Sequence, residues 1–224
     1  MKTIVSTSGG MDSAAVIAWA LDEGRDVFPV HFQYGAKNNK WERQAMLDVL
    51  AHFGLRQHLR HYDISACFTS FKSNLLDGQG EIPEGHFLEP AMTKTYLPAR
   101  NIVFAAILAG LAQSMEVDTI AFGFHQTPGD ITVYPDTTPA FFEAMKLAVE
   151  EGTGRATTLE APFVYTNKKG ILMDGIAREV PYELTRTCYK DQRLPCGKCG
   201  ACRKRLDAFE SLGLKDPVKY EEAD

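Results

Sequence analysis

The chain opens with a short β-branched strand, a turn that contains two glycines and an apolar helix, and this order constrains the fold most strongly. The strand is predicted over Thr3–Thr7, the turn is Ser8-Gly9-Gly10, and the helix is predicted over Asp12–Leu21. A second unit follows, with a strand over Val27–Phe32 and an amphipathic helix over Trp41–Phe53. Strands that alternate with helices predict a doubly wound, mostly parallel α/β sheet that is covered by helices on both faces.

The alternation continues toward the C-terminus and is interrupted twice. Further elements are predicted as a strand near His58–Ile64, a helix over about Asn101–Ser114, a strand over Thr119–Phe122 and a helix over Pro139–Glu150. Residues 68–96 and 124–138 show little hydrophobic periodicity, and loops of this length in a compact domain are usually functional or mobile. Because they follow elements of an open α/β sheet, we expect them to border a ligand site.

Composition excludes several classes of protein. The 224 residues are 45% hydrophobic and carry 24 basic against 29 acidic side chains, which is typical of a globular protein and gives no general affinity for nucleic acid. The longest apolar run, Ile102–Ala112, is too short to cross a bilayer and predicts a buried helix. No signal-peptide pattern opens the chain, so we expect a cytoplasmic protein with no membrane partner.

We place one α/β domain at residues 1–182 and an appended segment at 183–224.

Cysteines define that appended segment. Four thiols lie close together in the sequence, at Cys188, Cys196, Cys199 and Cys202. Four thiolates suit a structural, tetrahedral Zn²⁺ site with one ion per subunit, and Gly197 and Gly200 suit the turns of a metal-binding knuckle. An iron–sulfur cluster and a redox-active thiol remain alternatives. Cys67 is expected to be a lone buried or half-buried thiol.

The glycine turn is predicted to bind phosphate. The start of a helix presents unpaired N–H groups and the positive end of the helix dipole, and glycines let an anion approach the backbone closely. The turn lacks the G-K-[ST] sequence of a Walker A loop and the third glycine of a dinucleotide-binding fingerprint. The alternative is a plain strand-to-helix turn in which Asp12 or Ser13 is the N-cap.

The run Ser8-Gly9-Gly10-Met11-Asp12-Ser13 resembles the pyrophosphate loop of the N-type ATP pyrophosphatases, or PP-loop proteins. These proteins activate a carbonyl or carboxyl oxygen by adenylation, and their fold is a Rossmann-like sheet of the adenine nucleotide alpha hydrolase type. The resemblance implies that ATP contacts the residues from Thr7 to Ser13, and that Asp12 helps to place Mg²⁺ on the phosphates.

Within that group, the chain resembles the 7-cyano-7-deazaguanine synthase family of queuosine biosynthesis. The matching motifs are Phe32-x-Tyr34-Gly35, Pro98-x-Arg100-Asn101, Tyr134-Pro135-Asp136, Pro162 with Lys168, and Leu184-Thr185-x-Thr187-Cys188-Tyr189 followed by the cysteine run. The resemblance implies an ATP-dependent carbon–nitrogen ligase that converts 7-carboxy-7-deazaguanine and ammonia to the nitrile through an acyl adenylate and an amide. It also implies a homodimer whose partners are these small molecules and not nucleic acid.

The same resemblance assigns roles to single residues. Asp12, Ser13 and Lys168 are the expected catalytic residues, and Arg100 is expected to hold ATP through a phosphate, although its guanidinium also suits a carboxylate. The expected substrate contacts are Tyr34, Asn101 and Asp136, and the candidates for stacking on the base are Phe124, His125 and Tyr134. The plain alternatives are a solvated Lys168, a helix N-cap at Asn101 and a turn at Asp136.

The chain departs from the family pattern near the presumed base pocket. It has Ala36-Lys37-Asn38 where a Gln-Arg-His-like run is expected, Thr137-Thr138 where Cys-Arg is common, and a longer loop over residues 125–133. A related enzyme that stops at the amide or adenylates another carboxylate is therefore an alternative function. Two others are a transfer-RNA thiolation enzyme and a nucleic-acid-binding zinc module, the latter using the cations Lys198, Arg203, Lys204 and Arg205.

Overall fold

A computed structural model describes residues 1–125 and 134–221 and confirms the predicted parallel α/β sheet. The strands are β1 (Lys2–Ser6), β2 (Asp26–Gln33), β3 (Arg60–Asp63), β4 (Thr119–Ala121) and β5 (Thr158–Glu160). They form one sheet in the order β3-β2-β1-β4-β5, and every neighbouring pair is parallel. Ile4 of β1 lies opposite Phe28 on one side and Ile120 on the other. The chain reverses the direction of strand addition at β1, which makes the sheet doubly wound.

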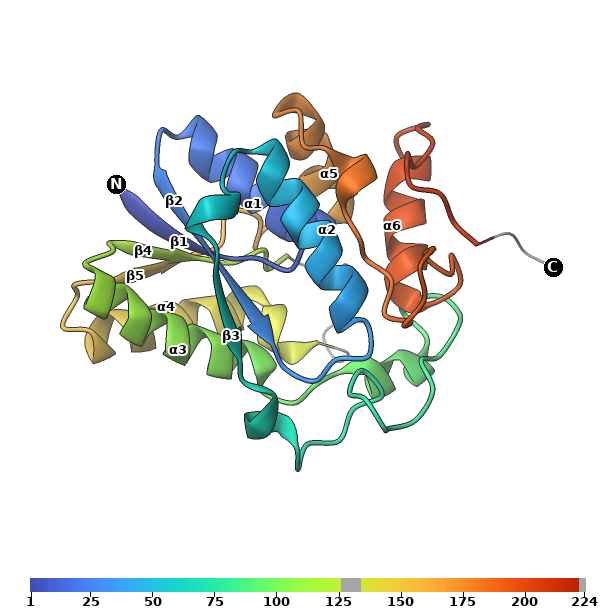
Figure 1. Cartoon of the computed structure of the whole chain (residues 1–224), viewed down its shortest axis with the longest axis horizontal. Helices are drawn as coiled ribbons and strands as arrows, with labels where there is room; N and C mark the ends of the chain where they lie inside the picture. The colour runs from blue at the N-terminus through green and yellow to red at the C-terminus, as the bar shows by residue number, and fades with distance from the viewer. Residues whose placement is uncertain (126–133, 222–224) are drawn as a thin grey trace.

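Six α-helices cover the two faces of this sheet among the described residues (Figure 1). They are α1 (Met11–Asp22), α2 (Asn39–His52), α3 (Arg100–Met115), α4 (Pro139–Gly152), α5 (Lys168–Ala177) and α6 (Gly200–Glu210). Helices α3 and α4 lie on one face, and α1, α2, α5 and α6 lie on the other. Successive side chains of β1 point to opposite faces of the sheet. Ile4 belongs to the hydrophobic core that contains Phe104 of α3, whereas Val5 belongs to the core that contains Ile17 of α1.

The apolar run in the middle of the chain forms the core helix α3. By length and composition, the segment Pro90–Met115 is apolar enough to cross a membrane. Its side chains Phe104, Leu108 and Ala112 are instead buried against the sheet, whereas Ile102 remains 44% exposed. The segment is also broken, because a 3-10 helix over Pro90–Thr95 ends before α3 begins.

Lys37 anchors the first long loop. Its Nζ donates hydrogen bonds of 2.8, 2.9 and 2.8 Å to the carbonyl oxygens of Asn74, Gln79 and Gly80, and an isolated β-bridge joins Ala36 to Leu76. Lys37, one of the residues that departs from the family pattern, therefore has a structural role in holding this loop.

In contrast to the prediction of a buried or half-buried thiol, Cys67 is exposed, because it lies in a surface 3-10 helix over Ser65–Phe68.

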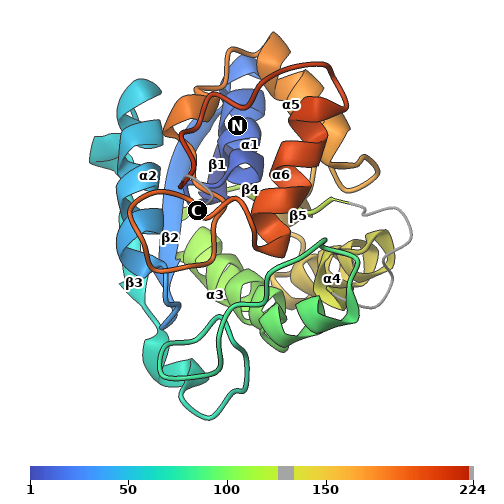
Figure 2. The ribbon, with the colours of Figure 1, turned by 90° about the vertical axis from the view of Figure 1, so that its right-hand side faces the viewer.

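A buried arginine stabilises the C-terminal segment through an ion pair within that segment and binds it to the sheet domain through a backbone carbonyl. Helix α6 lies beside α5 (Figure 2), and Arg205 of α6 is 1% exposed. Its guanidinium donates to both oxygens of Asp216, at 2.7 and 2.9 Å, and to the carbonyl oxygen of Tyr182 at 2.9 Å. Arg205 therefore holds the end of the chain in place, and it does not belong to a basic surface for nucleic acid.

Candidate active site

The run Ser8–Ser13, which is predicted to bind phosphate and is called the phosphate loop below, leads from the end of β1 into the first turn of α1. Helix α1 begins at Met11, and its N-cap is Gly10, which makes no side-chain capping bond. The alternative with Asp12 or Ser13 as the N-cap is therefore wrong. The Ser13 hydroxyl donates to the Gly10 carbonyl at 3.1 Å and accepts from the Ser8 amide at 3.2 Å. These bonds close the loop over the first turn of α1, whose N–H groups suit an anion.

Gly9 is required at its position for two reasons. Its φ is +75°, a conformation that side chains with a Cβ rarely adopt, and a Cβ there would lie 2.3 Å from the backbone nitrogen of Met46 on α2. Its carbonyl oxygen accepts a 2.9 Å hydrogen bond from the amide of Arg186. The loop is thus packed between α2 and the C-terminal segment.

We expect Gly9→Ala to destabilise the protein by roughly 2–5 kcal/mol, because left-handed strain adds to a backbone clash. The matched control is Gly24→Ala, since Gly24 has a φ of +68° but a Cβ there would meet nothing within 4 Å. That control is expected to cost about 1 kcal/mol, from strain alone. Chemical denaturation of the two variants measures the difference. Equal losses would show that the close packing on Met46 contributes nothing.

Asp12 and Lys168 form a close ion pair beside the loop. Lys168 Nζ lies 2.6 Å from Oδ1 and 2.5 Å from Oδ2 of Asp12, and the Lys168 side chain is only 9% exposed. Lys168 is the first residue of α5, where the Asn167 side chain accepts from the Gly170 amide and caps the helix. The alternative of a solvated lysine is therefore wrong.

Electrostatics keep Asp12 ionised and its histidine neighbour neutral. Burial raises the pKa of Asp12, but the attraction and the hydrogen bond from Lys168 act against burial, and that pKa lies below its usual value. Burial lowers the pKa of His125 to about 3, although Asp12 lies 3.9 Å from its ring nitrogen. At neutral pH the loop thus faces the ionised carboxylate of Asp12 and the neutral imidazole of His125.

One cavity of about 260 Å³ joins the phosphate loop to residues from distant parts of the chain. Of the residues predicted to act, those that line it are Thr7, Ser8, Gly10, Met11, Asp12, Ser13, Tyr34, Arg100, Asn101, Phe124, His125, Tyr134 and Lys168. Gly9 and Asp136 do not line it. The loop over residues 125–133, predicted to be longer than in the family, lies outside the described residues except for His125.

Arg100 and Tyr34 form a second polar corner of the cavity. Arg100 donates to the Tyr34 hydroxyl at 3.2 Å, and its guanidinium carbon lies 5.5 Å from the Tyr34 ring centre and 5.9 Å from that of Phe104. Burial lowers the pKa of Arg100, but Tyr34 and other neighbours raise it more, so the group is a permanent cation. It stands at the first position of α3, after Ala99 with a φ of 56°.

Asn101 and Asp136 bind each other. Asn101 is not the N-cap of α3, because Ala99 occupies that position. The Asp136 carboxylate accepts from the Asn101 amide at 3.1 Å, and the Asn101 side chain donates to the Asp136 carbonyl at 3.0 Å. Asp136 thus supplies a cap for α3 from a distant 3-10 helix. Thr138, which follows Asp136 and belongs to the Thr137-Thr138 pair that departs from the family pattern, is the N-cap of α4. Its side chain accepts from the amide of Phe141.

Several residues that line the cavity are not predicted from the sequence. Helix α2 contributes Glu42, and the C-terminal segment contributes Arg186, Thr187, Tyr189 and Lys204. In that segment the cysteines alone predict a site. The sequence signal for the other residues is indirect, because Thr187 and Tyr189 belong to a family motif and Lys204 is one of the cations beside the cysteines.

The four cysteines lie around one point. Their sulfurs are buried and all within 4.8 Å of one another, with separations of 3.6 Å for Cys188–Cys196 and 4.0 Å for Cys196–Cys202. Tetrahedral Zn–S bonds of about 2.3 Å place sulfurs about 3.8 Å apart, so the spacing suits one ion. The Lys198 and Cys199 amides donate to the Cys196 sulfur at 3.4 and 3.3 Å, as in a knuckle. A [4Fe–4S] cluster, with several irons between the sulfurs, requires a wider spacing.

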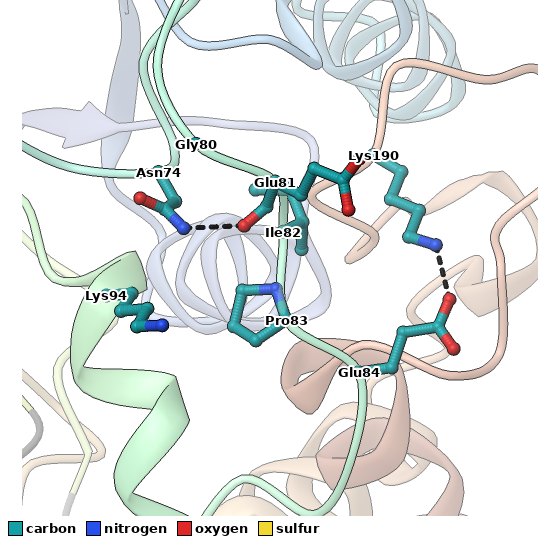
Figure 3. A pocket seen from close by; sticks show the side chains of 8 residues that line it. All are labelled: Asn74, Gly80, Glu81, Ile82, Pro83, Glu84, Lys94 and Lys190. Atoms are coloured by element: carbon teal, nitrogen blue, oxygen red, sulfur yellow. Dashed lines mark hydrogen bonds and ion pairs between the residues drawn. The ribbon is translucent and has the colours of Figure 1, made fainter.

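A second cavity, of about 660 Å³, is larger but chemically less suited to a site (Figure 3). It is bordered by the loop over residues 80–84, where the Asn74 side chain donates to the Glu81 carbonyl oxygen at 2.6 Å. Its Lys190 and Glu84 point toward each other and form a 2.5 Å ion pair, with side chains 30% and 49% exposed. No phosphate-loop residue lines it, so we place the active site in the smaller cavity.

Comparison with known proteins gives a family match over nearly the whole chain. The sequence model of the family described as queuosine biosynthesis protein QueC matches residues 2–213. The 7-cyano-7-deazaguanine synthase of Marinomonas sp. is 37% identical over 222 residues, which cover 98% of this chain and 98% of that protein. The corresponding synthase of Rhizobium leguminosarum bv. trifolii is 36% identical over 228 residues, covering 100% of this chain and 94% of that protein.

Solved structures share the fold at low sequence identity. The U34-tRNA thiolase NcsA from Methanococcus maripaludis with its [4Fe–4S] cluster has a TM-score of 0.50 and 11% identity, covering 95% of this chain and 66% of that chain. A 4-thiouridine synthetase in an RNA complex with bound ATP has a TM-score of 0.50 and 17% identity, covering 88% and 44%. At this identity the likeness concerns the fold alone.

Proposed function

The chain belongs to the family of queuosine biosynthesis protein QueC, and we propose that its cavity converts 7-carboxy-7-deazaguanine, ammonia and ATP to 7-cyano-7-deazaguanine. The observation that carries this proposal is that one cavity brings the phosphate loop and the Asp12–Lys168 pair together with the Arg100–Tyr34 corner. A nucleotide and a planar, carboxylated base need such a combination of phosphate, cationic and aromatic contacts.

We assign the phosphate end to ATP. The substrate carboxylate attacks the α-phosphate, pyrophosphate leaves, and ammonia then displaces AMP from the acyl adenylate to give an amide. A second activation converts the amide oxygen to a leaving group as the nitrile forms. Thr7–Ser13 and Arg100 would bind the phosphates, Lys168 would neutralise the charge that develops on them, and Asp12 would hold Mg²⁺. Mg²⁺, when bound, supplies charge neutralisation and orientation of the phosphates.

We assign the base to the side of the cavity next to α3. Tyr34 and Asn101 line this side, and Asp136 fixes the first turn of α3 from behind. Phe124, His125 and Tyr134 also line the cavity, and their rings provide surfaces for a planar heterocycle. In this arrangement Asp136 positions the wall of the pocket.

We propose that the cysteine site holds Zn²⁺ in a structural role. The four buried thiols leave no open position for water on a tetrahedral ion, and they lie in a segment whose Arg186, Thr187 and Tyr189 line the cavity. The ion would hold this wall in place. We further propose a cytoplasmic homodimer, with α3, whose Ile102 side chain is exposed, at the interface.

The direct test is incubation of the purified protein with 7-carboxy-7-deazaguanine, ammonium, Mg²⁺ and ATP, followed by mass spectrometry of base and nucleotide. We expect the nitrile together with AMP. An amide that accumulates would favour the alternative enzyme that stops at that stage. No consumption of the base by a protein that still binds ATP would contradict the proposed substrate.

A further inference from the structure

Glu42 is a cavity carboxylate that the assigned roles leave unused. Two carboxylates line the cavity within residues 1–125 and 134–221, those of Asp12 and Glu42. Both Asp12 oxygens accept from Lys168. Glu42 instead accepts through Oε2 from the side chain of Asn38, at 3.1 Å. Its other oxygen, Oε1, accepts from no described protein group, and Oε2 keeps a second acceptor site beside its bond from Asn38, so both oxygens can still accept from a ligand.

Asn38 holds Glu42 in one orientation. Its Nδ2 donates to Glu42 Oε2 and also to the carbonyl oxygen of Cys188, at 3.1 Å each, and its side chain is buried. Burial raises the pKa of Glu42 to about 7, while Arg100, Asn38 and Arg186 act in the opposite direction. A ligand that donates N–H groups to this carboxylate would favour its charged form further. Glu42 is therefore a preorganised acceptor on the cavity wall.

We propose that Glu42 recognises the guanine edge of the substrate by accepting from its ring N–H and its exocyclic amine. This inference rests on the proposed function and names the group that selects the base. A guanine-type base presents these two donors side by side, which matches a carboxylate, whereas an adenine ring presents an acceptor nitrogen next to its amine. Tyr34 and Tyr189 line the same cavity and supply aromatic surface. Asp136, the sequence-based candidate, already bonds Asn101 and does not line the cavity.

The test compares two bases in the unsubstituted protein and in Glu42→Gln. One base is 7-carboxy-7-deazaguanine and the other is its analogue without the 2-amino group. We expect the unsubstituted protein to prefer the amino base in kcat/KM by about 10- to 100-fold, the range for one bidentate base contact. Glu42→Gln should raise KM for the amino base and reduce the preference to about threefold or less, with KM for ATP changed less than about twofold.

The matched control is Asp48→Asn, which makes the same carboxylate-to-amide change on α2 at a residue that bonds Gln44 outside the cavity. It should keep the preference unchanged. Glu42→Asp changes the same position but keeps a carboxylate, so it should keep more of the preference for the amino base than Glu42→Gln. This comparison separates loss of the carboxylate from a general loss of folding. A Glu42→Gln enzyme that still prefers the amino base as strongly as the unsubstituted protein would overturn the inference. Failure of the unsubstituted protein to use either base would overturn the proposed function itself.

Discussion

Asp12→Asn is expected to lower kcat by roughly 10³-fold, because it removes the carboxylate that pairs with Lys168 and to which the proposed function assigns Mg²⁺ and the phosphates. The same change leaves Lys168, 9% exposed, without its charged partner. We therefore also expect a loss of about 1–3 kcal/mol in the free energy of unfolding, less than for a fully buried pair because Asp12 is 26% exposed. Single-turnover kinetics and chemical denaturation measure the two effects.

The double variant Asp12→Asn/Lys168→Met separates catalysis from stability. Removing the unpaired ammonium group should restore most of the lost free energy of unfolding, because no buried charge remains. Activity should stay at the level of Asp12→Asn or below. An Asp12→Asn protein with normal turnover would exclude a role in phosphate chemistry. A double variant as unstable as Asp12→Asn would show that the ion pair is not the source of the instability.

The doubly wound sheet was predictable because its first units carry strong periodic signals. Thr3–Thr7 is β-branched, and the glycine turn separates it from a clear apolar helix. β5 and α5 were not predicted. β5 has only three residues, and α5 starts with two lysines and contains two glycines. The local propensity for strand or helix is therefore weak in both segments, and tertiary packing determines their conformation. Of these lysines, Lys168 is buried by its contact with Asp12, a long-range partner.

Part of the site could be predicted because phosphate loops and metal knuckles depend on local sequence. A phosphate-binding turn at a helix start uses glycines at nearby positions, and thiols two residues apart can bind one ion. Other residues that line the cavity belong to no local sequence motif. Glu42 reaches it from α2, and Arg186 reaches it through a backbone bond to Gly9 that joins residues far apart in the chain. Contacts of this kind depend on how the elements pack.

Removal of the cysteine-bound metal is expected to unfold the C-terminal segment and abolish activity together. The segment forms a wall of the cavity through Arg186, Thr187 and Tyr189, and Asn38 links the Cys188 carbonyl to Glu42. Because structural metal binding contributes directly to folding, Cys199→Ser should behave as the metal-depleted protein does. Elemental analysis should give about one zinc per chain. Iron in its place would contradict the assignment.

Trp41 provides a local probe for this coupling. Its indole nitrogen donates to Asp191 at 2.9 Å, in the segment between the first two cysteine ligands, so its fluorescence should change on chelation. Trp19 also emits, and it packs on Arg25, far along the chain from the cysteines. The variant Trp41→Phe removes the first signal and keeps the second. With Cys67→Ser as the thiol control, since Cys67 is exposed and lies outside the cluster, activity and zinc content should be unchanged. A Cys199→Ser protein that keeps both activity and the Trp41 signal would show that the sheet domain holds the wall without the metal.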